Sequence, residues 1–330
     1  MINLSTEYLG IKLKNPVVVG SCGLTDTPDK VLAAANAGAG AVVLKSLFEE
    51  EIIAEMDEQF DEMNRPSAVF PENYAFWDES DKQDLIREYL DLIRKSKERV
   101  DIPVIASVNC VSAQKWTYLA AEIEKAGADA LELNIFLLPS DINRSAEEYR
   151  NQIIEIIQKV RSETKLPLSV KLSNYSSELS KLIADLSKMG VEGFTLFNRS
   201  YSPDFDIEKM TLTAGNVLSH PGDVALPLRW SALLSSKIES DIAASTGVHT
   251  GEDLVKVLLA GSTCAHVVSA LYRKGVEEIA LILNFLKDWM ARHGYQSIIE
   301  FKGAMALDET KEAADYERVQ FYRTFRTFEI

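Results

Sequence analysis

Short apolar runs alternate with segments of helical periodicity along most of the chain. Eight such runs occur, each of four or five residues and with few polar residues inside it. Strands buried on both faces, as in a parallel sheet, have this composition, whereas a half-exposed strand alternates apolar and polar residues. The runs predict strands at residues 16–19, 41–44, 103–106, 130–133, 167–170, 193–197, 241–244 and 264–268.

Segments with helical spacing of apolar residues lie between these runs. In one of them, Leu85, Tyr89 and Leu92 repeat at the spacing of a single helical face. The predicted helices are residues 28–37, 80–99, 113–126, 145–163, 176–189, 228–236, 251–260 and 275–293.

Four junctions between helix and strand are near copies of one another. They read AGAGAVVLK, AGADALELN, MGVEGFTLFN and AGSTCAHVVS, and they lead into the second, fourth, sixth and eighth strands. The third and fifth strands begin instead with a proline. This alternation fits a barrel whose core layers are filled by alternate strands. We therefore predict an α/β fold, a (βα)8 TIM barrel forming a single domain over residues 1–330; a doubly wound open sheet is the alternative.

Four segments fall outside the repeating units. Residues 6–13 alternate weakly and predict a small hairpin or plug. Residues 49–78 are acidic and aromatic, and we expect this insertion after the second strand to fold over the barrel mouth. Residues 199–226 form a longer loop, and residues 294–330 form a C-terminal extension that caps the barrel or meets a partner.

The composition excludes several classes of function. A net charge of −15 and a pI of about 4.9 argue against nucleic-acid binding, because a polyanion would be repelled. Three scattered cysteines, with no CxxC or HExxH motif, predict neither disulfides nor a metal site. The N-terminus does not resemble a signal peptide, and no apolar stretch approaches the roughly 20 residues of a membrane span. We expect a cytoplasmic protein without membrane contact.

Polar residues stand at the C-terminal end of each predicted strand, where barrels of this class place their function. Two lysines and three carboxamides suit a neutral or anionic planar ligand rich in carbonyl groups. No carboxylate or histidine stands among them to hold a metal. The candidate residues are Ser21, Lys45, Ser46, Asn109, Asn134, Lys171, Asn198, Ser245, Thr246, Gly247 and Ser269.

One carboxylate, Glu132, lies two residues inside the fourth strand. Strand alternation points its side chain the same way as Asn134, so Glu132 is expected either to hold Lys171 in place or to form a structural ion pair with it inside the barrel.

The last two units suggest a phosphate cradle. One strand runs into Ser245–Val248 and a helix, and the next runs into Ser269, Ala270 and Leu271. Barrels commonly bind phosphate at these loops through backbone N–H groups, and Gly247 would let the backbone approach the anion closely. An ordinary turn before a helix capped by Thr250 is the alternative.

These residues make the chain resemble the dihydroorotate dehydrogenase family, flavin-binding (βα)8 barrels, over nearly its whole length. The matching segments are KNPVVVGSCG, AGAGAVVLKS, IPVIASVN, AGADALELN, LPLSVKL, the FN of Phe197-Asn198, ASTGVHTGEDLVKVLLAG, SALYRKG and HGYQSIIEFKG. A dihydroorotate dehydrogenase-like subgroup is the nearest match, through LKSLFEEEI, LELNIFLLPSD, LFNRSYSPD and LPLRW.

The resemblance implies FMN as the cofactor and an oxidoreductase acting on a small molecule. It places Lys45 and Lys171 beside the flavin ring, where they would stabilise the charge of the reduced flavin. Asn134, Asn198 and Arg199 are implied as substrate contacts. The remaining implied FMN contacts are Ser21, Ser46, Asn109, Asn134, Ser245, Thr246, Gly247, Ser269 and Ala270.

The loop after the fourth strand departs from the family pattern. Active members carry a Cys or Ser there that removes a proton from the substrate, in a motif like ELNxSCPN. This chain has Leu137 and Leu138 at that place, and leucine cannot accept a proton. Ser140 is the only hydroxyl nearby and is the candidate base. The Asn-rich substrate loop after the second strand is also missing, and Thr246 and Val268 replace frequent glycines.

Three functions therefore remain open. The first is an FMN oxidoreductase whose substrate is not necessarily dihydroorotate. The second is a true dihydroorotate dehydrogenase of pyrimidine biosynthesis with a non-standard base. The third is a catalytically inactive FMN-binding protein. The resemblance also makes a homodimer plausible, with residues 199–226 and Trp230 as a possible interface.

Overall fold

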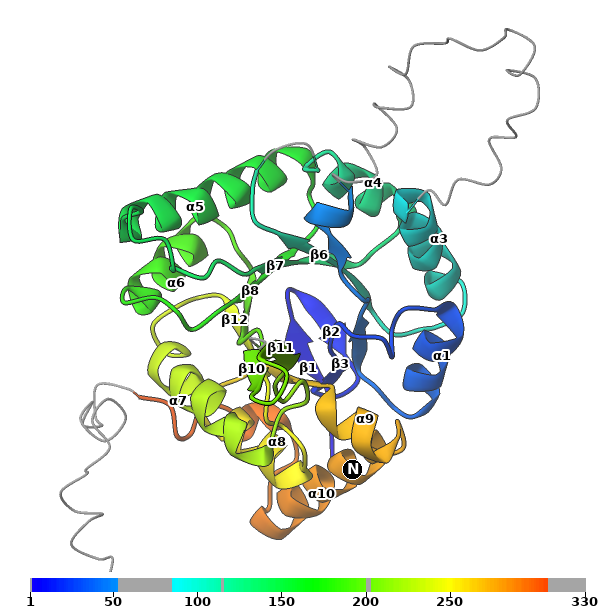
Figure 1. Cartoon of the computed structure of the whole chain (residues 1–330). Helices are drawn as coiled ribbons and strands as arrows, with labels where there is room; N and C mark the ends of the chain where they lie inside the picture. The colour runs from blue at the N-terminus through cyan, green and yellow to red at the C-terminus, as the bar shows by residue number, and fades with distance from the viewer. Residues whose placement is uncertain (1, 53–84, 114–115, 200–202, 308–330) are drawn as a thin grey trace, which may run out of the picture.

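The chain folds into a closed barrel of eight parallel strands surrounded by helices (Figure 1), as predicted. The computed structural model describes residues 2–52, 85–113, 116–199 and 203–307. The strands follow one another around the barrel in chain order, and pairing of β4 with β6 closes the ring. They are β3 (Val17–Val19), β4 (Ala41–Val43), β6 (Val104–Cys110), β7 (Ala130–Ile135), β8 (Leu168–Leu172), β9 (Gly193–Leu196), β12 (Asp241–Ser245) and β13 (Cys264–Val267).

Helices lie between successive strands and cover the outside of the barrel. They are α1 (Pro28–Asn36), α3 (Leu85–Lys97), α4 (Leu119–Ala126), α5 (Ala146–Glu163), α6 (Leu179–Lys188), α7 (Ala225–Leu234), α8 (Gly251–Leu259), α9 (Ser269–Lys274) and α10 (Glu278–His293). All eight predicted helices are present, with shifted ends, and α9 was not predicted. Among these described helices none is long and apolar enough to cross a membrane.

Strand alternation divides the apolar residues into an outer and an inner core. Val17 and Val19 pack outward against the helices, whereas Val18 between them faces the lumen. Small and branched residues from several strands complete this lower lumen layer, among them Ile105 and Ala130. The outer cluster is much the larger, so the contact between helices and barrel wall supplies most of the apolar burial.

An N-terminal hairpin closes the lower end of the barrel, as the weak alternation of residues 6–13 predicted. Strands β1 (Thr6–Tyr8) and β2 (Ile11–Leu13) pair antiparallel and lie across the ring in Figure 1. Tyr8, Leu9 and Leu13 are at most 2% exposed and belong to the inner core. A Cβ on Gly193 would stand 2.4 Å from Cδ2 of Leu9, so the hairpin packs closely against this strand.

Three strands extend further than their apolar runs. Asn109, Asn134 and Lys171, expected just beyond the strands, lie inside β6, β7 and β8. They were expected at exits because polar residues seldom occupy a buried strand. The upper lumen of this barrel is polar, so polar residues can occupy these strands on the face that lines it.

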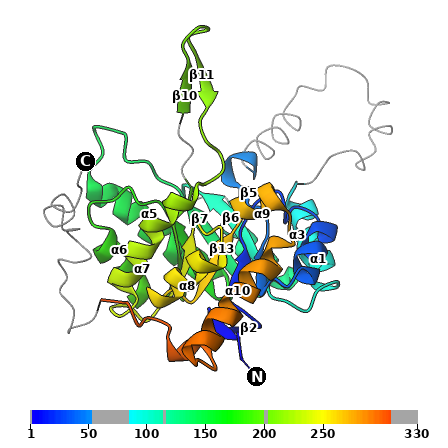
Figure 2. The ribbon, with the colours of Figure 1, turned by 90° about the horizontal axis from the view of Figure 1, so that it is seen from below.

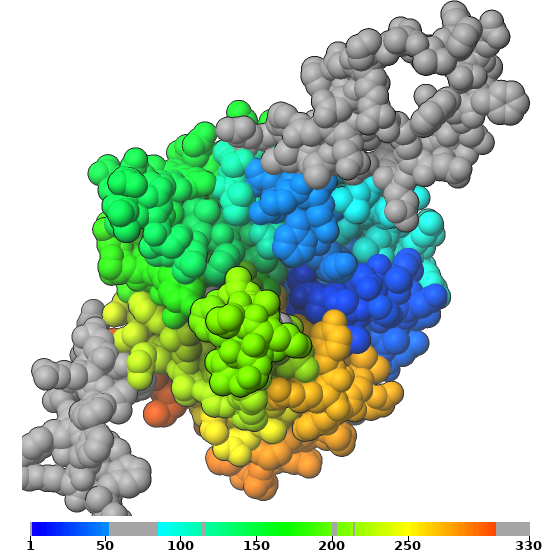
Figure 3. All heavy atoms as spheres, viewed as in Figure 1, coloured from blue at the N-terminus to red at the C-terminus, as the bar shows by residue number. Residues whose placement is uncertain are grey.

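A second hairpin, which the sequence pattern did not reveal, rises from the loop after β9. Strands β10 (Pro203–Asp206) and β11 (Thr211–Ala214) pair antiparallel, with Phe205 opposite Leu212. The hairpin stands clear of the barrel on the face opposite to β1–β2 (Figure 2) and extends over part of the mouth in the space-filling view (Figure 3).

The insertion after the second barrel strand and the C-terminal extension are each described only in part. Residues 49–52 form a helical turn after the short strand β5 (Leu47–Phe48), and the rest of the expected insertion, 53–78, lies outside the described residues. The extension is described to Leu307, whose N–H bonds to the Ala232 carbonyl. Phe301 in this extension packs edge-on against Trp289 of α10, which fixes the extension to the helical layer.

Candidate functional site

Three polar residues form a row across adjacent strands at the mouth of the barrel. Asn109 pairs with Asn134, and Asn134 pairs with Lys171, in the parallel register of β6, β7 and β8. Registered residues on neighbouring strands point to the same face and stand roughly 4.8 Å apart. The strands therefore bring two carboxamides and one ammonium group to one level of the lumen.

Asn198 joins this row from the end of β9. Its side-chain nitrogen donates to Oδ1 of Asn134 at 2.8 Å, and its backbone N–H bonds to the Leu172 carbonyl. Asn134 is 7% exposed. The bond uses the oxygen of the Asn134 carboxamide, and no hydrogen bond from its nitrogen to a described residue is present.

Lys171 is buried without a partner. Only 9% of the residue is exposed, and its ammonium group makes no hydrogen bond or ion pair with any residue in the described ranges. Its ammonium nitrogen is not among the fully buried polar atoms that lack a partner, so it keeps contact with the open mouth. Lys45, the second expected lysine, is exposed just beyond β4 and likewise has no ion-pair partner in those ranges.

Hydroxyl groups line the side of the mouth next to β4 and β6. The Ser46 hydroxyl lies 3.0 Å from that of Ser21 and 2.8 Å from that of Ser107. Tyr89 of α3 fixes Ser107, because its hydroxyl bonds both the N–H and the carbonyl of that residue. Ser21 and Ser46, both predicted, are therefore adjacent.

A second polar layer lies directly beneath the row. Glu132 Oε2 accepts from the Thr195 hydroxyl at 2.7 Å, and Thr195 also contacts Ser169. The Tyr8 hydroxyl of the N-terminal hairpin reaches Ser169 at 2.9 Å. The expected ion pair between Glu132 and Lys171 is not formed, so Thr195 rather than the lysine is the partner of this carboxylate.

His266 completes this lower layer from β13. Its Nδ1 lies 3.8 Å from Glu132 Oε2, and neither ring nitrogen has a hydrogen-bond partner in the described part of the chain. Burial lowers the pKa of His266 to about 4, so the ring is neutral at neutral pH. The sequence analysis missed His266 and Thr195, although alternation within their strands places both in the lumen.

Two residues of the loop after β12 have left-handed backbone conformations. Thr246 and Gly247 both adopt positive φ, 75° and 79°. A Cβ on Gly247 would stand 2.0 Å from the Val224 nitrogen, so only glycine fits this close approach. The Thr246 hydroxyl is buried without a partner among the described residues. Such strain in a non-glycine residue is found mostly at functional sites.

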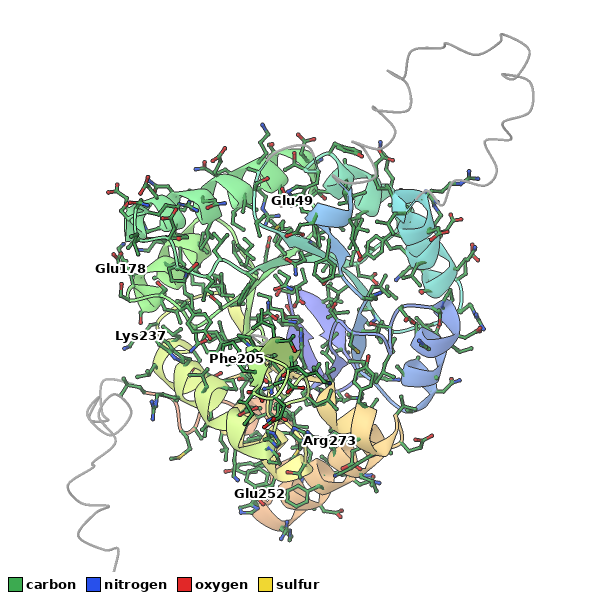
Figure 4. The ribbon with its side chains drawn as sticks, in the orientation of Figure 1. Glu49, Glu178, Phe205, Lys237, Glu252 and Arg273 are labelled. Carbon is green, nitrogen blue, oxygen red and sulfur yellow. The ribbon has the colours of Figure 1, made fainter. Side chains whose placement is uncertain are left out.

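Ser269 and Ala270 begin α9 beside that loop, and both are buried. The Ser269 hydroxyl accepts from the Ser219 N–H at 2.9 Å, and the Ser219 hydroxyl lies 2.9 Å from His249 Nε2. Arg273, marked in Figure 4, donates to the Ser219 carbonyl. The capped turn weighed as the alternative is also present, since Thr250 and Asp253 cap α8 reciprocally.

Arg199 does not point a free guanidinium into the mouth. Its nitrogens donate to the carbonyls of Asn216, Val217 and Leu218 and to the Asp223 carboxylate at 2.7 Å. These bonds use at least four of its five donors, so Arg199 orders the loop that leads to Ser219.

The apolar loop after β7 faces away from the lumen. Leu137 and Pro139 line a cavity of about 370 Å³ between α5, α6 and the loop after β8. Leu138 is 50% exposed, and Ser140 is also exposed. Within the described ranges, no group of three or more metal-ligating side chains is present.

Comparison with known proteins identifies the family of the chain. The sequence model of the family described as "Dihydroorotate dehydrogenase" matches residues 79–290, more than half of the chain. Dihydroorotate dehydrogenase B (NAD(+)), catalytic subunit, from Pyrococcus abyssi is 26% identical over 315 residues, 91% of this chain and 98% of that protein. The corresponding subunit from Thermoplasma acidophilum is 24% identical over 314 residues, 92% and 99% of the two chains.

A relative named for a different activity matches over a similar length. The NAD-dependent dihydropyrimidine dehydrogenase subunit PreA of Escherichia coli K12 is 23% identical over 335 residues, 96% of this chain and 80% of that protein. The barrel, the polar mouth and the family match together show that the chain belongs to the dihydroorotate dehydrogenase family.

Proposed function

We propose that the barrel mouth binds FMN and that this dihydroorotate dehydrogenase-like oxidoreductase oxidises or reduces a CH–CH bond in a small, carbonyl-rich ring. Lys171, a buried residue whose ammonium group has no partner among the described residues, carries the proposal. An isoalloxazine ring presents carbonyl oxygens, and it becomes negatively charged on reduction, which Lys171 would stabilise. When bound, FMN accepts or supplies the hydride.

The residues of the mouth fit this cofactor. Asn109, Asn134 and Lys171 offer donors at one level for the ring, and Ser21 and Ser46 offer hydroxyls at its side. Lys45, also assigned to the ring, stands exposed at the rim. For the phosphate group of FMN we propose a binding cradle formed by the loop of Ser245, Thr246 and Gly247 together with Ser269 and Ala270. The positive φ values and the unpartnered Thr246 hydroxyl support this cradle.

For the substrate we propose Asn134 and Asn198, whose carboxamides meet at the mouth. Arg199 would act through the loop that it orders rather than by contact. The relatives are named dihydroorotate and dihydropyrimidine dehydrogenases, and these names support a dihydropyrimidine ring as substrate and a place in pyrimidine metabolism. Such rings carry carbonyl and N–H groups that carboxamides can bind in pairs.

In its described position, the loop after β7 offers no acceptor at the mouth for the proton from the second carbon. Leu137 and Leu138 cannot accept it, and Ser140 is exposed. A loop movement that brings Ser140 to the mouth would restore a base, and a reaction driven in the reducing direction would need a proton donor there instead.

Spectroscopy of the purified protein tests the proposal. We expect FMN absorbance at about one equivalent, and bleaching by anaerobic titration with dihydroorotate, dihydrouracil or NADH. Lys171→Met should lower FMN affinity at least tenfold, whereas Lys188→Met, an exposed control lysine, should not. A wild-type protein that binds no FMN contradicts the proposal, and bound FMN that no donor reduces indicates an inactive binding protein.

We also propose a homodimer that buries the β10–β11 hairpin. Phe205, marked in Figure 4, and its cross-strand neighbour Leu212 are 69% and 71% exposed. Ile207 and Met210 at the tip are 81% and 89% exposed. An isolated two-stranded hairpin is marginally stable, so this apolar surface needs cover. Trp230 packs against Phe197 and the core instead.

Light scattering after gel filtration tests the dimer. Phe205→Asp combined with Leu212→Asp should halve the molar mass, whereas Thr213→Asp, which lies one position along the same strand and points to the other face, should not. A wild-type monomer, or a dimer in the double variant, contradicts this interface.

A further inference from the structure

A cavity of about 370 Å³ lies in the helical layer, outside the barrel wall and behind the polar row. Ile135 and Leu172 form its inner wall. They are paired on β7 and β8, and each directly follows a residue of the row, Asn134 or Lys171. Strand alternation turns these two apolar side chains away from the lumen. The cavity and the mouth are therefore separate spaces on opposite faces of the same two strands.

The walls of the cavity are mainly apolar, with contributions from α5, α6 and the loop after β7. They include Ile153, Leu179, Leu182, Leu137 and Pro139. An apolar cavity of about 150 Å³ is enough to hold a benzene ring, and ligand pockets measure roughly 300–1,000 Å³. The space therefore suits a ring or a branched chain that carries a short substituent.

Ser173 brings an unused hydroxyl to this cavity. Only 9% of the residue is exposed, and its hydroxyl makes no hydrogen bond with any residue that the structure describes. The hydroxyl oxygen is not among the fully buried polar atoms that lack a partner, so it keeps contact with open space. Because Ser173 lines the cavity, this hydroxyl is available to a ligand there.

Arg150 of α5 adds a guanidinium group to the lining. Its Nη2 pairs with the Asp185 carboxylate, whereas Nε and Nη1 have no hydrogen-bond partner in the described ranges. Folded proteins leave few such donors unpaired. Lys181 also pairs with Asp185, so that carboxylate has a second cation and does not depend on Arg150 alone.

The cavity opens to solvent beside Tyr175 and Glu178. Both residues line it and both are exposed, and Glu178 is marked in Figure 4 at the outer edge of the helical layer. Behind this rim, the free polar groups are the hydrogen-bond donors of Ser173 and Arg150. A ligand that enters from the rim therefore meets apolar walls and groups that need an acceptor.

We propose that this cavity binds a small molecule with an apolar body and a carbonyl or carboxylate oxygen, which accepts hydrogen bonds from Ser173 and Arg150. The site lies outside the lumen, so it does not require FMN in the mouth. A ligand there would contact Leu137 of the loop after β7 and the residues that follow Asn134 and Lys171 on their strands.

Ligand-observed NMR titrations with three compounds test the site. Phenylacetate and acetophenone carry the oxygen, whereas toluene offers a similar ring without it. We expect a Kd of about 1 mM or lower for at least one of the first two, and binding of toluene at least about fivefold weaker. Tighter binding of phenylacetate assigns the site to carboxylates, and tighter binding of acetophenone assigns it to neutral carbonyl compounds. Binding of neither compound, or equally tight binding of toluene, overturns the inference.

Matched variants test the two donors. Ser173→Ala and Arg150→Met should each raise the Kd about fivefold, because each removes a hydrogen bond to the ligand. Ser180→Ala, at an exposed position on α6, should leave the Kd unchanged. So should Lys181→Met, which keeps the pair between Arg150 and Asp185. A Kd that stays at the wild-type value in both donor variants rules out the proposed contacts.

A filled cavity gives a test that does not depend on the donors. Ala146 lines the cavity at an exposed position on α5, so a larger side chain can enter without displacing the core. Ala146→Trp should weaken binding at least about tenfold. Glu147→Trp, one residue along α5 and outside the lining, should bind like the wild type. Equal binding in the two variants would place the ligand elsewhere and refute the site.

Lys171→Met separates this site from the barrel mouth. The variant should bind phenylacetate and acetophenone like the wild type, because Lys171 faces the lumen, whereas its affinity for FMN should fall. Loss of both compounds in Lys171→Met would mean that they bind in the mouth, which contradicts the inference. A wild-type protein that binds them in the cavity but does not bind FMN contradicts the proposed function alone.

Discussion

Asn198 donates its side-chain amide to Oδ1 of Asn134 at 2.8 Å, joining the end of β9 to the middle of the polar row on β7. The bond fixes which way the Asn134 carboxamide points. Its oxygen faces Asn198, so its nitrogen is the atom left to donate to a ligand. One residue thereby sets the hydrogen-bonding character of another at the centre of the proposed site.

Asn198→Ala should release that orientation and weaken ligand binding. We expect KM for the substrate to rise about tenfold, because a hydrogen bond of this kind contributes about 1 kcal/mol and Asn134 would rotate between two states. Steady-state kinetics with the donor that bleaches the flavin gives the measurement. Asn143→Ala, in an exposed loop, is the control; equal KM values in the two variants would contradict the assignment.

Gly247→Ala should disrupt the phosphate cradle. Its φ is positive, and an added Cβ would stand 2.0 Å from the Val224 nitrogen, which leaves no room for a side chain. We expect a loss of about 2 kcal/mol or more in the free energy of unfolding and weaker FMN binding. Gly222→Ala, which would meet nothing within 4 Å, should change neither quantity. Denaturant unfolding measures the stability of both variants, and titration with FMN measures their affinity for the cofactor.

Glu49→Ala should loosen the loop after β6. The buried Glu49 carboxylate, marked near α4 in Figure 4, accepts from the N–H groups of Val111 and Ser112 at 2.7 and 2.9 Å. Glu49 also accepts from the Ser112 hydroxyl, so its loss removes the acceptor of three hydrogen bonds, and we expect about 2 kcal/mol lower stability in urea. Glu50→Ala, at the exposed neighbouring position, should cost less than about 0.5 kcal/mol. A similar loss in both would refute the anchoring role.

Acid should destabilise the protein partly through His266. Its pKa is about 4 in the folded protein and about 6.5 when unfolded, so the unfolded chain binds more protons between these values. The contribution of His266 to the free energy of unfolding is present above about pH 6.5. It is lost as the pH falls to about 4, by up to about 3 kcal/mol. Carboxylates titrate in the same window, so the difference between variants is informative.

Urea unfolding at several pH values measures the difference in stability between the wild type and the variants. His266→Gln should show a shallower loss of stability between about pH 6.5 and about pH 4 than the wild type. His293→Gln, at an exposed position on α10, should follow the wild type. Parallel curves for the wild type and His266→Gln would contradict the burial of a neutral imidazole.

The barrel could be predicted because each strand is an apolar run and the junctions before alternate strands repeat. The β10–β11 hairpin could not, because its turn, Ile207–Met210, contains no Gly, Asn or Pro. Met210 supplies the positive φ, 51°, that such residues usually supply. Its Phe205–Leu212 pair has no core to pack against, so no buried pattern marks it.

The polar row of the candidate site followed from strand order alone, since Asn109, Asn134 and Lys171 come from consecutive strands. Contacts between segments that are distant in sequence could not be predicted from strand order. Ser219 reaches Ser269 from 50 residues away, and no spacing in the chain encodes that bond. The roles of these residues stay predictions until the cofactor is measured.

The N-terminal hairpin gives the lumen a blind end. Tyr8 and Leu9 seal the bottom, and the Tyr8 hydroxyl is already bonded to Ser169 in the lower polar layer. Among the described residues the lumen is closed at this end, so we expect ligands to enter it from the mouth. If the mouth binds FMN as proposed, a substrate and a second reactant would have to reach the flavin ring from the same end of the barrel.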